Sequence, residues 1–407
     1  MTRHIIFIGD GMGDRPVASL GGLTPVAAAR TPNLDRLASG GLLGLARTTP
    51  ENMPCSSDVC IMSLLGYDPR GVLTGRGPLE ALARNVDLPP GTLAFRLNLV
   101  TLELGAETVM RDHSAGDIPD DQARILVGAL GRELFRDPGR NVYPGVSYRN
   151  VLTWRDAPEG LPSVQPHDFL GREVGHILDD PAYAPLAETV RASWPILAGH
   201  PVNRDRAGKG LNPANSVWLW GQGKTPGVRS YRERWGLRGA TVSAVDIIRG
   251  LARATGLEPL DVPGATGTLD TNYEGKARAA SLALRDNDLV VVHLEAPDET
   301  SHQGRLDQKL QAIENFDRLI VGPVVRAAEE LGGDFRVLCA CDHLTPLELR
   351  THTADPVPFL VYDSRGTGRQ NPPAAGYSEA EAAKTGLTVP DGPSLGRLFL
   401  GPEIGGE

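Results

Sequence analysis

Three short apolar runs along the chain each lead to an acidic residue. Runs of this kind, rich in Val, Ile and Leu, are typical of the central strands of a parallel sheet that is covered on both faces. The carboxyl ends of parallel strands share one edge, where ligands bind in open α/β folds. The pattern therefore predicts an α/β fold with an active site at that edge. The runs are His4–Ile8, Asp288–Leu294 and Val337–Cys341, and the acids that follow them are Asp10, Asp298 and Asp342.

Helical periodicity appears between these runs. In 31–37, a threonine that predicts an N-cap precedes Pro32 at the first helical position, and leucines follow three residues apart. A second short helix is expected over 57–66, with a serine or aspartate cap and a glycine stop. The helical pattern over 307–331 contains Pro323, which predicts a kink because proline donates no backbone hydrogen bond. Further helices are expected over 245–255 and 276–284 and from Ser378, and further strands over 216–220 and 357–362.

The residue pattern of the chain changes between about residues 74 and 211. Irregular segments rich in Pro, Gly and Arg replace the long apolar runs, and they enclose a strand pattern over 91–101 and a helical pattern over 120–135. We therefore expect a smaller α+β cap domain, 75–211, inserted into a discontinuous core of 1–74 and 212–407. The expected fold class is α/β, with a mostly parallel central sheet between helices in the core.

Composition narrows the possible partners. The chain has 407 residues, of which 41% are apolar and 22% charged, which is ordinary for a soluble globular protein. A formal net charge of −9, without a dense basic stripe, argues against nucleic-acid binding. The sequence has no charged and apolar leader and no 18-residue apolar run, so we expect no membrane association and a cytoplasmic location. Four cysteines are too few for a disulfide framework, and we expect reduced residues that serve packing, including Cys339 and Cys341.

The acids that follow the strands have histidine neighbours. His302 lies four residues after Asp298, so a helical turn would place both on one face. Each such pair alone is more often a solvated surface pair or a helix cap. Together, however, three converging carboxylates would repel one another unless a cation lay among them. Asp and His ligands in this number suit two divalent metals, the arrangement that clamps the oxygens of a phosphoryl group.

Ser57 is the candidate nucleophile for such a site. It lies at the expected start of a helix, where unpaired backbone N–H groups and the helix dipole favour negative charge. Metal coordination would also lower the pKa of its hydroxyl. The simpler interpretation is that Ser57 is only an N-cap, and Ser56 competes for either role.

These residues also carry a family resemblance that covers nearly the whole chain. In combination the motifs resemble the archaeal-type 2,3-bisphosphoglycerate-independent phosphoglycerate mutases of the alkaline phosphatase superfamily. The matching segments are Ile8–Asp14, Thr31–Leu37, Ser57–Val59, Ser63–Pro69, Gly75–Glu80, Val262–Gly267, Asp270–Tyr273, Asp298–His302, Asp342–Pro346 and His352–Pro358.

The resemblance implies an isomerase of glycolysis and gluconeogenesis. In such enzymes an alkaline-phosphatase-like core is interrupted by a cap domain, and a serine takes the phosphoryl group from one hydroxyl of a phosphoglycerate and returns it to the neighbouring one. The metal is commonly manganese, with magnesium, cobalt or zinc as relatives. The pattern of the family places Asp298, His302 and His352 on one metal, and Asp10, Ser57, Asp342 and His343 on the other.

Basic residues are candidates for binding the small phosphorylated substrate. Guanidinium groups suit carboxylates and phosphates because they donate paired hydrogen bonds, although most arginines are solvated surface groups. The candidates in the inserted segment are Arg96, Asn98, His167, Asp168, Arg204 and Arg206, and those nearer the core are Arg76 and Lys276.

One departure from the family pattern concerns the substrate. The family usually has Pro-Gly before the nucleophilic Ser-Asp, whereas this chain has Cys55 and Ser56 there. Three alternatives therefore stay open: a phosphotransferase acting on another small substrate, as in homoserine kinases, a phosphomonoesterase, and a binding protein that has lost the chemistry. The oligomeric state also stays open.

Overall fold

The chain folds into two compact units. The computed structural model describes residues 2–370, 372–401 and 403. Unit 1 combines Met1–Leu73 with Gly227–Glu407, and unit 2 is Thr74–Pro226. The observed boundary at Pro226 differs from the expected one at residue 211, because the strand β7 (Ser216–Gly223) pairs with β3 (Thr92–Leu104) of unit 2. The sequence identified a buried strand at this position but could not say which sheet it joins.

Unit 1 is built on one mixed sheet of eight strands. The strand β1 (Arg3–Gly9) lies between β10 (Leu289–Leu294) and β11 (Phe335–Ala340), and both neighbours run parallel to it. Ile8 is paired with His293 on one side and Ala340 on the other, so all three strands end at the same edge. The predicted α/β fold with a mostly parallel sheet is confirmed. The remaining strands are β8 (Gly239–Val242), β9 (Glu258–Leu260), β12 (Val357–Asp363), β2 (Leu42–Ala46) and β13 (Thr388–Val389).

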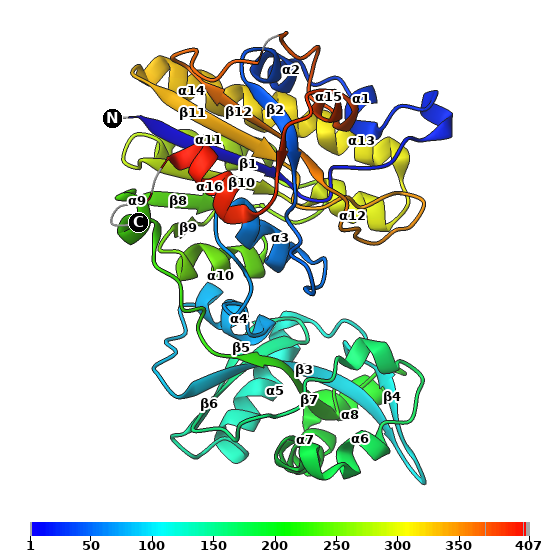
Figure 1. Cartoon of the computed structure of the whole chain (residues 1–407). Coiled ribbons are helices and arrows are strands. Elements are labelled where there is room, and N and C mark those ends of the chain that lie inside the picture. Colours follow the sequence, from blue (N-terminus) through cyan, green and yellow to red (C-terminus); the bar gives the residue numbers. More distant parts are fainter. Residues whose placement is uncertain (1, 371, 402, 404–407) are drawn as a thin grey trace. The chain divides into compact units, whose positions relative to one another are not determined.

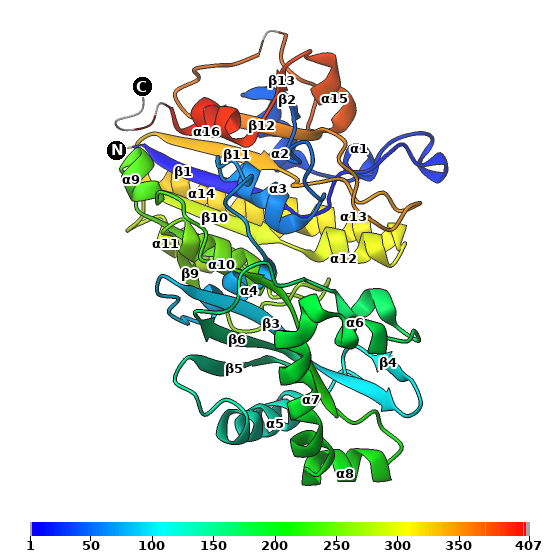
Figure 2. The same cartoon turned by 60° about the horizontal axis from the view of Figure 1, so that its bottom comes forward.

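Helices cover both faces of this sheet. In Figure 1, α3 (Ser57–Leu64) and α16 (Gly392–Leu400) lie in front of the sheet and contact each other. On the other face, α11 (Tyr273–Ala283) packs against α14 (Gly322–Leu331), and Figure 2 shows the sheet between the two layers. The helix expected over 245–255 is α10 (Asp246–Ala254), and the one expected over 276–284 is α11, so both are confirmed within a few residues. The other helices of unit 1 are α1 (Pro25–Ala28), α2 (Pro32–Ser39), α9 (Tyr231–Trp235), α12 (Ala296–His302), α13 (Leu306–Asn315) and α15 (Glu379–Lys384).

The predicted long helix over 307–331 is interrupted near Pro323. The helix α13 passes into a π-helical turn, Phe316–Val321, before α14 begins, and Pro323 occupies one of the first two positions of α14. Proline cannot donate the backbone hydrogen bond of a continuous α-helix, and a π-turn accommodates the lost bond. The interruption is therefore confirmed, and its form is a π-turn.

This π-turn also supplies the cap of α2. The carboxylate of Asp317 accepts hydrogen bonds from the backbone N–H of Asn33 at 3.2 Å and of Leu34 at 2.7 Å. Thr31, at the N-cap position, makes no side-chain capping bond, so the predicted threonine cap is wrong. A carboxylate stabilises a helix start more than a hydroxyl does, because its charge also interacts with the helix dipole.

Unit 2 is an antiparallel sheet packed against helices. Its strand order is β4-β3-β6-β5, and β7 also pairs with β3. The helices α5 (Asp120–Glu133) and α7 (Ala184–Ala198) bury their apolar residues in one core with β3 and β7. The other elements are α4 (Arg76–Ala83), β4 (Thr108–Asp112), β5 (Arg140–Val146), β6 (Arg149–Arg155), α6 (Gly175–Asp179) and α8 (Pro201–Gly208). In the part of the chain that the structure describes, no helix is long and apolar enough to cross a membrane.

A buried lysine joins two loops at the carboxyl edge of the unit 1 sheet. Lys309 on α13 is fully buried, and its Nζ donates to Asp14 Oδ2 at 2.8 Å. The same nitrogen donates to the carbonyl oxygens of Gly13 at 3.2 Å and Thr345 at 3.0 Å. Gly13 and Asp14 follow β1, and Thr345 follows β11, so one ammonium group holds together the two loops that contain the acids of the predicted site.

Replacement of Lys309 by Met should destabilise unit 1 by about 3–5 kcal/mol, because it leaves the Asp14 carboxylate buried without its partner. Arg36→Met is the matched control, since it breaks an exposed pair with Glu329 and should cost less than about 1 kcal/mol. Denaturant unfolding in the presence of a chelator measures both. Equal losses of unfolding free energy in the two variants would contradict the larger contribution that we expect from the buried pair of Lys309 and Asp14.

Candidate metal centre and active site

The three acids predicted to converge lie at one edge of the unit 1 sheet. Asp10 directly follows β1, and Asp342 lies two residues beyond the end of the neighbouring strand β11. Asp298 lies on α12, which follows β10 on the other side of β1. All three carboxylates are buried, and the Gly11 N–H donates to Asp342 Oδ1 at 3.0 Å. Parallel strands in register thus place residues from distant parts of the chain in one buried cluster.

His343 lies at the centre of the first group of predicted ligands. Its Nε2 atom is 3.2 Å from Asp342 Oδ2 and 3.5 Å from Asp10 Oδ1. The same nitrogen is 3.3 Å from Oγ of Ser57, the first residue of α3. Ser56 occupies the N-cap position and makes no side-chain capping bond. The hydroxyl of Ser57 therefore faces the buried cluster and does not cap the helix.

The second group consists of Asp298, His302 and His352. The helix α12 places His302 one turn after Asp298, and His302 Nε2 is 3.1 Å from Asp298 Oδ2. His352 Nε2 is 3.0 Å from His302 Nε2 and 3.5 Å from Asp298 Oδ1. Its ring stacks on that of His343 at 3.7 Å between centroids, which joins the two groups. The donor Thr345 Oγ1 holds Asp298 Oδ1 at 2.6 Å.

The cluster is electrostatically strained without a cation. Burial, followed by repulsion from Asp342 and Asp298, raises the pKa of Asp10 well above its usual range. Burial also raises the pKa of Asp342. Asp298 differs, because although burial opposes it, hydrogen bonds from His302 and His352 lower the pKa of this carboxyl. Bound positive charge would relieve the repulsion between the acids.

The available ligand atoms fit divalent cations. Asp10 Oδ1 and Asp342 Oδ2 are buried and have no hydrogen-bond partner among the residues that the structure describes. Ligand atoms of Asp10, Asp342 and His343 lie within 4.8 Å of one another, as do those of Asp298, His343 and His352. Buried acceptors without donors are costly, so a pair of them facing one point indicates a missing positive partner. Carboxylate and imidazole ligands suit manganese, magnesium, cobalt and zinc alike.

The structure adds a residue that sequence reasoning missed. His293 on β10 is fully buried, and its Nε2 lies 2.9 Å from Asp10 Oδ2. Its Nδ1 lies 3.1 Å from Oγ of Ser243, which follows β8. Burial and the positive charge of Lys276 lower the pKa of His293 to about 3, so the ring is neutral at physiological pH. A histidine inside the apolar run 289–294 was the signal that could have found it.

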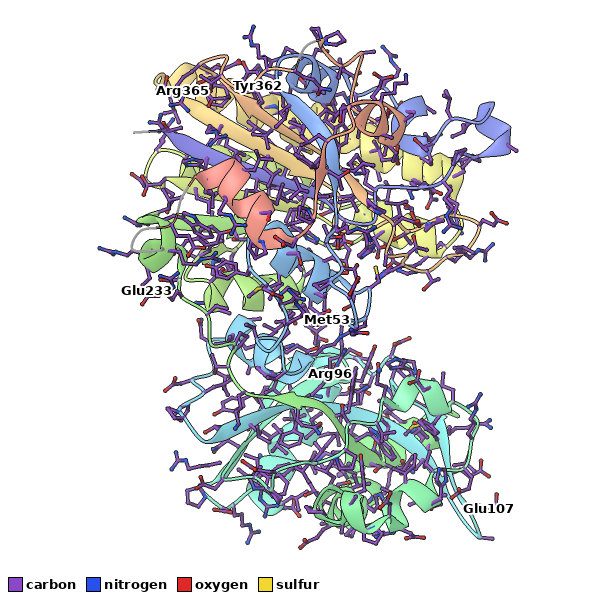
Figure 3. All side chains as sticks on the ribbon, viewed as in Figure 1. Met53, Arg96, Glu107, Glu233, Tyr362 and Arg365 are labelled. Atoms are coloured by element: carbon purple, nitrogen blue, oxygen red, sulfur yellow. The ribbon has the colours of Figure 1, made fainter. Side chains whose placement is uncertain are left out.

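A second polar cluster lies in unit 2 and contains the predicted residues Arg96, Asn98 and His167. The guanidinium of Arg96, labelled in Figure 3, lies 4.9 Å from the ring centroid of Trp220. Asn98 Oδ1 accepts from Trp220 Nε1 at 3.1 Å. The His167 ring is 5.6 Å from that of Trp220. A further member is His113, whose ring lies 6.1 Å from His167 and whose buried Nδ1 has no hydrogen-bond partner among the described residues.

The other predicted substrate ligands have different surroundings. Asp168 is exposed beside His167, and their side chains approach to 3.8 Å. Arg206 is buried on α8 and donates to the carbonyl oxygens of Asn212 and Ala115, whereas the exposed Arg204 donates to the carbonyl of Gly199. These contacts give both arginines structural partners, and their role in substrate binding stays a prediction.

Lys276 lies in unit 1 on α11 and is almost fully buried. Its Nζ donates to the carbonyl oxygen of Thr266 at 3.3 Å. Burial lowers the pKa of this amine to about 8, although the nearby charge of Glu295 opposes the shift. The charge of this amine acts on His293, so Lys276 belongs to the surroundings of the cluster, and its role toward substrate also stays a prediction.

The cysteines have packing environments. Cys339 and Cys341 are fully buried, and all four cysteines carry free thiols. Cys60 is also buried, with its Sγ 3.2 Å from Thr49 Oγ1, whereas Cys55 is partly exposed. The packing predicted for Cys339 and Cys341 agrees with their burial.

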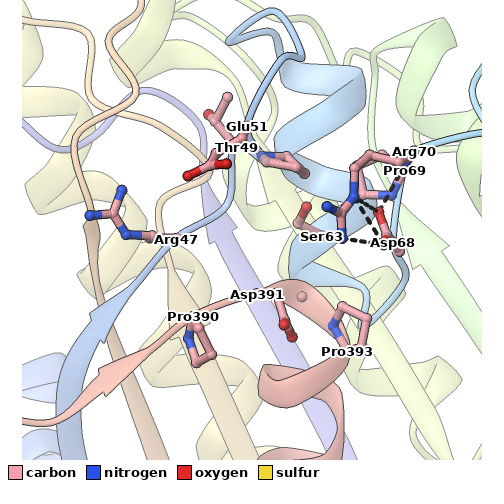
Figure 4. A pocket seen from close by; sticks show the side chains of 12 residues that line it. Arg47, Thr49, Glu51, Ser63, Asp68, Pro69, Arg70, Pro390, Asp391 and Pro393 are labelled. Carbon is pink, nitrogen blue, oxygen red and sulfur yellow. Dashed lines mark hydrogen bonds and ion pairs between the residues drawn. The ribbon is translucent and has the colours of Figure 1, made fainter.

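A separate cavity of about 440 Å³ lies beside α3 in unit 1 (Figure 4). Ser63 lines it from the carboxyl end of α3, and Asp391 lines it at the start of α16. Arg70 pairs with Asp68 on its wall at 2.7 Å, so charges of both signs surround it. None of the predicted ligands lines this cavity, which is therefore distinct from the carboxylate cluster.

Comparison with known proteins identifies the family. Residues 38–203 match the family model described as 2,3-bisphosphoglycerate-independent phosphoglycerate mutase. A protein of Geobacter sulfurreducens named as a probable mutase of this kind is 46% identical over 98% of this chain and 99% of its own. A mutase of Methanothrix thermoacetophila is 44% identical over 98% and 99% of the two chains. The chain belongs to the family of 2,3-bisphosphoglycerate-independent phosphoglycerate mutases.

Solved structures agree with membership of this mutase family. A structure from Pyrococcus horikoshii matches with a TM-score of 0.82 at 30% identity, covering 98% of this chain and 96% of the other. The cofactor-independent phosphoglycerate mutase from Thermoplasma acidophilum matches with a TM-score of 0.67 at 29% identity, covering 98% and 99%. The predicted family resemblance is confirmed over almost the whole chain.

For this member of the mutase family, the carboxylate cluster predicts that divalent cations stabilise the fold. Manganese at a hundred times its dissociation constant should stabilise the wild-type protein by about 2.7 kcal/mol, measured as a rise in melting temperature. Asp342→Asn should lose most of this rise, while its stability in chelator should equal or exceed that of the wild type, because one buried like charge is gone.

Asp205→Asn serves as the control for that experiment, since Asp205 is exposed and pairs with Lys209 at 2.7 Å. Its manganese response should equal that of the wild type. A full manganese response in Asp342→Asn would contradict a cation site at Asp342.

Proposed function

We propose that the protein interconverts 3-phosphoglycerate and 2-phosphoglycerate through a phosphoserine at Ser57. The observation that carries this proposal is the position of the Ser57 hydroxyl, 3.3 Å from His343 Nε2 at the edge of a buried carboxylate cluster with free acceptor atoms. The names of the full-length relatives support the same substrate. A binding protein without chemistry is not favoured, because every residue that the reaction needs is present.

Two divalent cations fit the ligand set, and manganese is the metal that we expect at both positions. Bound cations would neutralise charge on the transferred phosphoryl group and lower the pKa of the serine hydroxyl. The ligands that we assign to one cation are Asp298, His302 and His352, and those assigned to the other are Asp10, Ser57, Asp342 and His343.

Ser57 and the start of α3 then have the following roles in phosphoryl transfer. Oγ of Ser57 gives up its proton and forms a bond to phosphorus while the bond from phosphorus to the C3 oxygen of the substrate breaks, and that oxygen takes up a proton. The backbone N–H groups at the start of α3 favour the negative charge of the phosphoserine. In the return step the C2 hydroxyl gives up its proton and bonds to phosphorus, while the bond from phosphorus to Ser57 Oγ breaks and Oγ takes up a proton. Glycerate must stay bound between the two steps, or the phosphoserine would be lost to hydrolysis.

The cluster in unit 2 is our candidate for retaining the glycerate. The Arg96 guanidinium is held by Glu80, whose Oε1 lies 3.3 Å from Arg96 Nε, and by a cation–π contact with Trp220. Its other nitrogens and the ring of His113 offer donors to a carboxylate or phosphate. Burial of Arg96 increases the strength of a charge-assisted hydrogen bond to an anion.

A coupled assay for 2-phosphoglycerate, run beside an assay for free phosphate, tests the substrate. We expect rapid formation of 2-phosphoglycerate from 3-phosphoglycerate with little phosphate release. Phosphate release without isomerisation would indicate a phosphomonoesterase and contradict the proposal.

Ser57→Ala should lower mutase turnover by several orders of magnitude and abolish the phosphoenzyme, because the covalent route is closed. The phosphoenzyme is measured by acid quench after mixing with 3-phosphoglycerate labelled in its phosphoryl group. Ser56→Ala is the matched control at the next residue and should retain both the label and the activity. Unchanged mutase activity in Ser57→Ala would contradict the phosphoserine mechanism.

Arg96→Gln should raise KM for 3-phosphoglycerate by about 10–100-fold, which corresponds to the loss of a hydrogen bond from a charged donor. Manganese affinity should not change, because Arg96 belongs to unit 2 and all the ligands that we assign to the cations belong to unit 1. Arg204→Gln is the control, since this exposed guanidinium contacts only the Gly199 carbonyl. Comparable KM effects of the two substitutions would argue against the unit 2 cluster as the anion site.

A further inference from the structure

Among the residues that the structure describes, Asp10 is the only acid of the cluster that is hydrogen-bonded to an imidazole outside the predicted set of metal ligands. One carboxylate oxygen, Oδ2, lies 2.9 Å from His293 Nε2. The other, Oδ1, has no hydrogen-bond partner in that part of the chain and lies 3.5 Å from His343 Nε2. One oxygen of the Asp10 carboxylate is thus hydrogen-bonded, and the other has no hydrogen-bond partner among the described residues.

We propose that Ser243 and His293 form a relay that orients Asp10, so that Oδ1 is the oxygen presented to the cation. This inference rests on the proposed function, because it assumes a cation at the Asp10 group. It makes His293 and Ser243 positioning residues, since neither contacts the substrate or the reacting atoms.

The hydrogen-bond pattern determines the tautomer of His293. An ionised carboxylate can only accept, so Nε2 of His293 must carry the proton that it donates to Asp10. Nδ1 is then an acceptor. Ser243 Oγ already accepts from the Val245 N–H at 3.1 Å, which leaves its hydroxyl proton to donate to Nδ1. The chain of donors therefore runs from the Val245 N–H through Ser243 and His293 to Asp10 Oδ2.

The backbone makes this relay rigid. His293 pairs in register with Ile8 of β1, two residues before Asp10. Ser243 follows β8, the strand on the other side of β10. The three residues therefore come from adjacent strands of one sheet, and both His293 and Ser243 are buried. Partners that orient a metal ligand in this way typically alter metal affinity by 10–100-fold when they are removed.

The test is the dissociation constant for Mn²⁺ of the full-length protein, measured by calorimetry and by electron paramagnetic resonance. His293→Phe removes the donor and keeps a planar ring, and it should weaken binding of one Mn²⁺ ion by about 10–100-fold. His293→Gln retains an N–H donor and should recover most of this loss. Mutase activity of His293→Phe should rise with Mn²⁺ up to concentrations well above those that saturate the wild type.

His4→Phe is the matched control. His4 is also a buried histidine, and it lies at the other end of β1, where its ring contacts Phe399. We expect His4→Phe to bind Mn²⁺ with the affinity of the wild type. A folded His293→Phe protein that binds Mn²⁺ as tightly as the wild type would overturn the relay.

Ser243→Ala decides the question if His293→Phe does not fold. It removes only the hydroxyl that holds Nδ1, and we expect Mn²⁺ binding to weaken several-fold, whereas an unchanged affinity would overturn the relay. Failure of the proposed function has a different signature: a wild-type protein that binds Mn²⁺ but forms no 2-phosphoglycerate contradicts the proposed reaction, and one that binds no Mn²⁺ contradicts the cation site.

Discussion

Repulsion among three buried carboxylates is the constraint on which the site depends. Asp10, Asp298 and Asp342 are brought together by the register of β1, β10 and β11, and all three are buried. Their neighbours are arranged to hold them in place: a neutral histidine behind Asp10, backbone N–H groups on Asp342 and a hydroxyl on Asp298. Such an arrangement favours cations and disfavours the metal-free state.

The surrounding structure holds the loops of this edge in place with polar contacts. The ammonium of Lys309 connects the loop after β1 to the loop after β11, and the π-turn carboxylate of Asp317 fixes the start of α2. These contacts are buried, so each loses much free energy if one partner is removed. The long loop from Asp342 to Asp355 is thereby held at the edge of the sheet where the acids lie.

Unit 2 contributes chemistry of a different kind. Its cluster of Arg96, His113 and His167 around Trp220 contains donors and an aromatic surface, and it has none of the acidic ligands found in unit 1. The family relatives span the same length, so both units are shared features of the family.

The sequence by itself determined the strands that end in acids, the spacing of Asp298 and His302 on one helical face, and the serine at the start of α3. These features are local, because hydrophobic periodicity and helix spacing are read within a few residues. Only the tertiary structure decided that His293 holds Asp10, that Asp317 replaces Thr31 as the cap of α2, and that β7 joins the sheet of unit 2. Each of these depends on register and packing between segments far apart in the chain, and no local pattern records which strand will lie beside another.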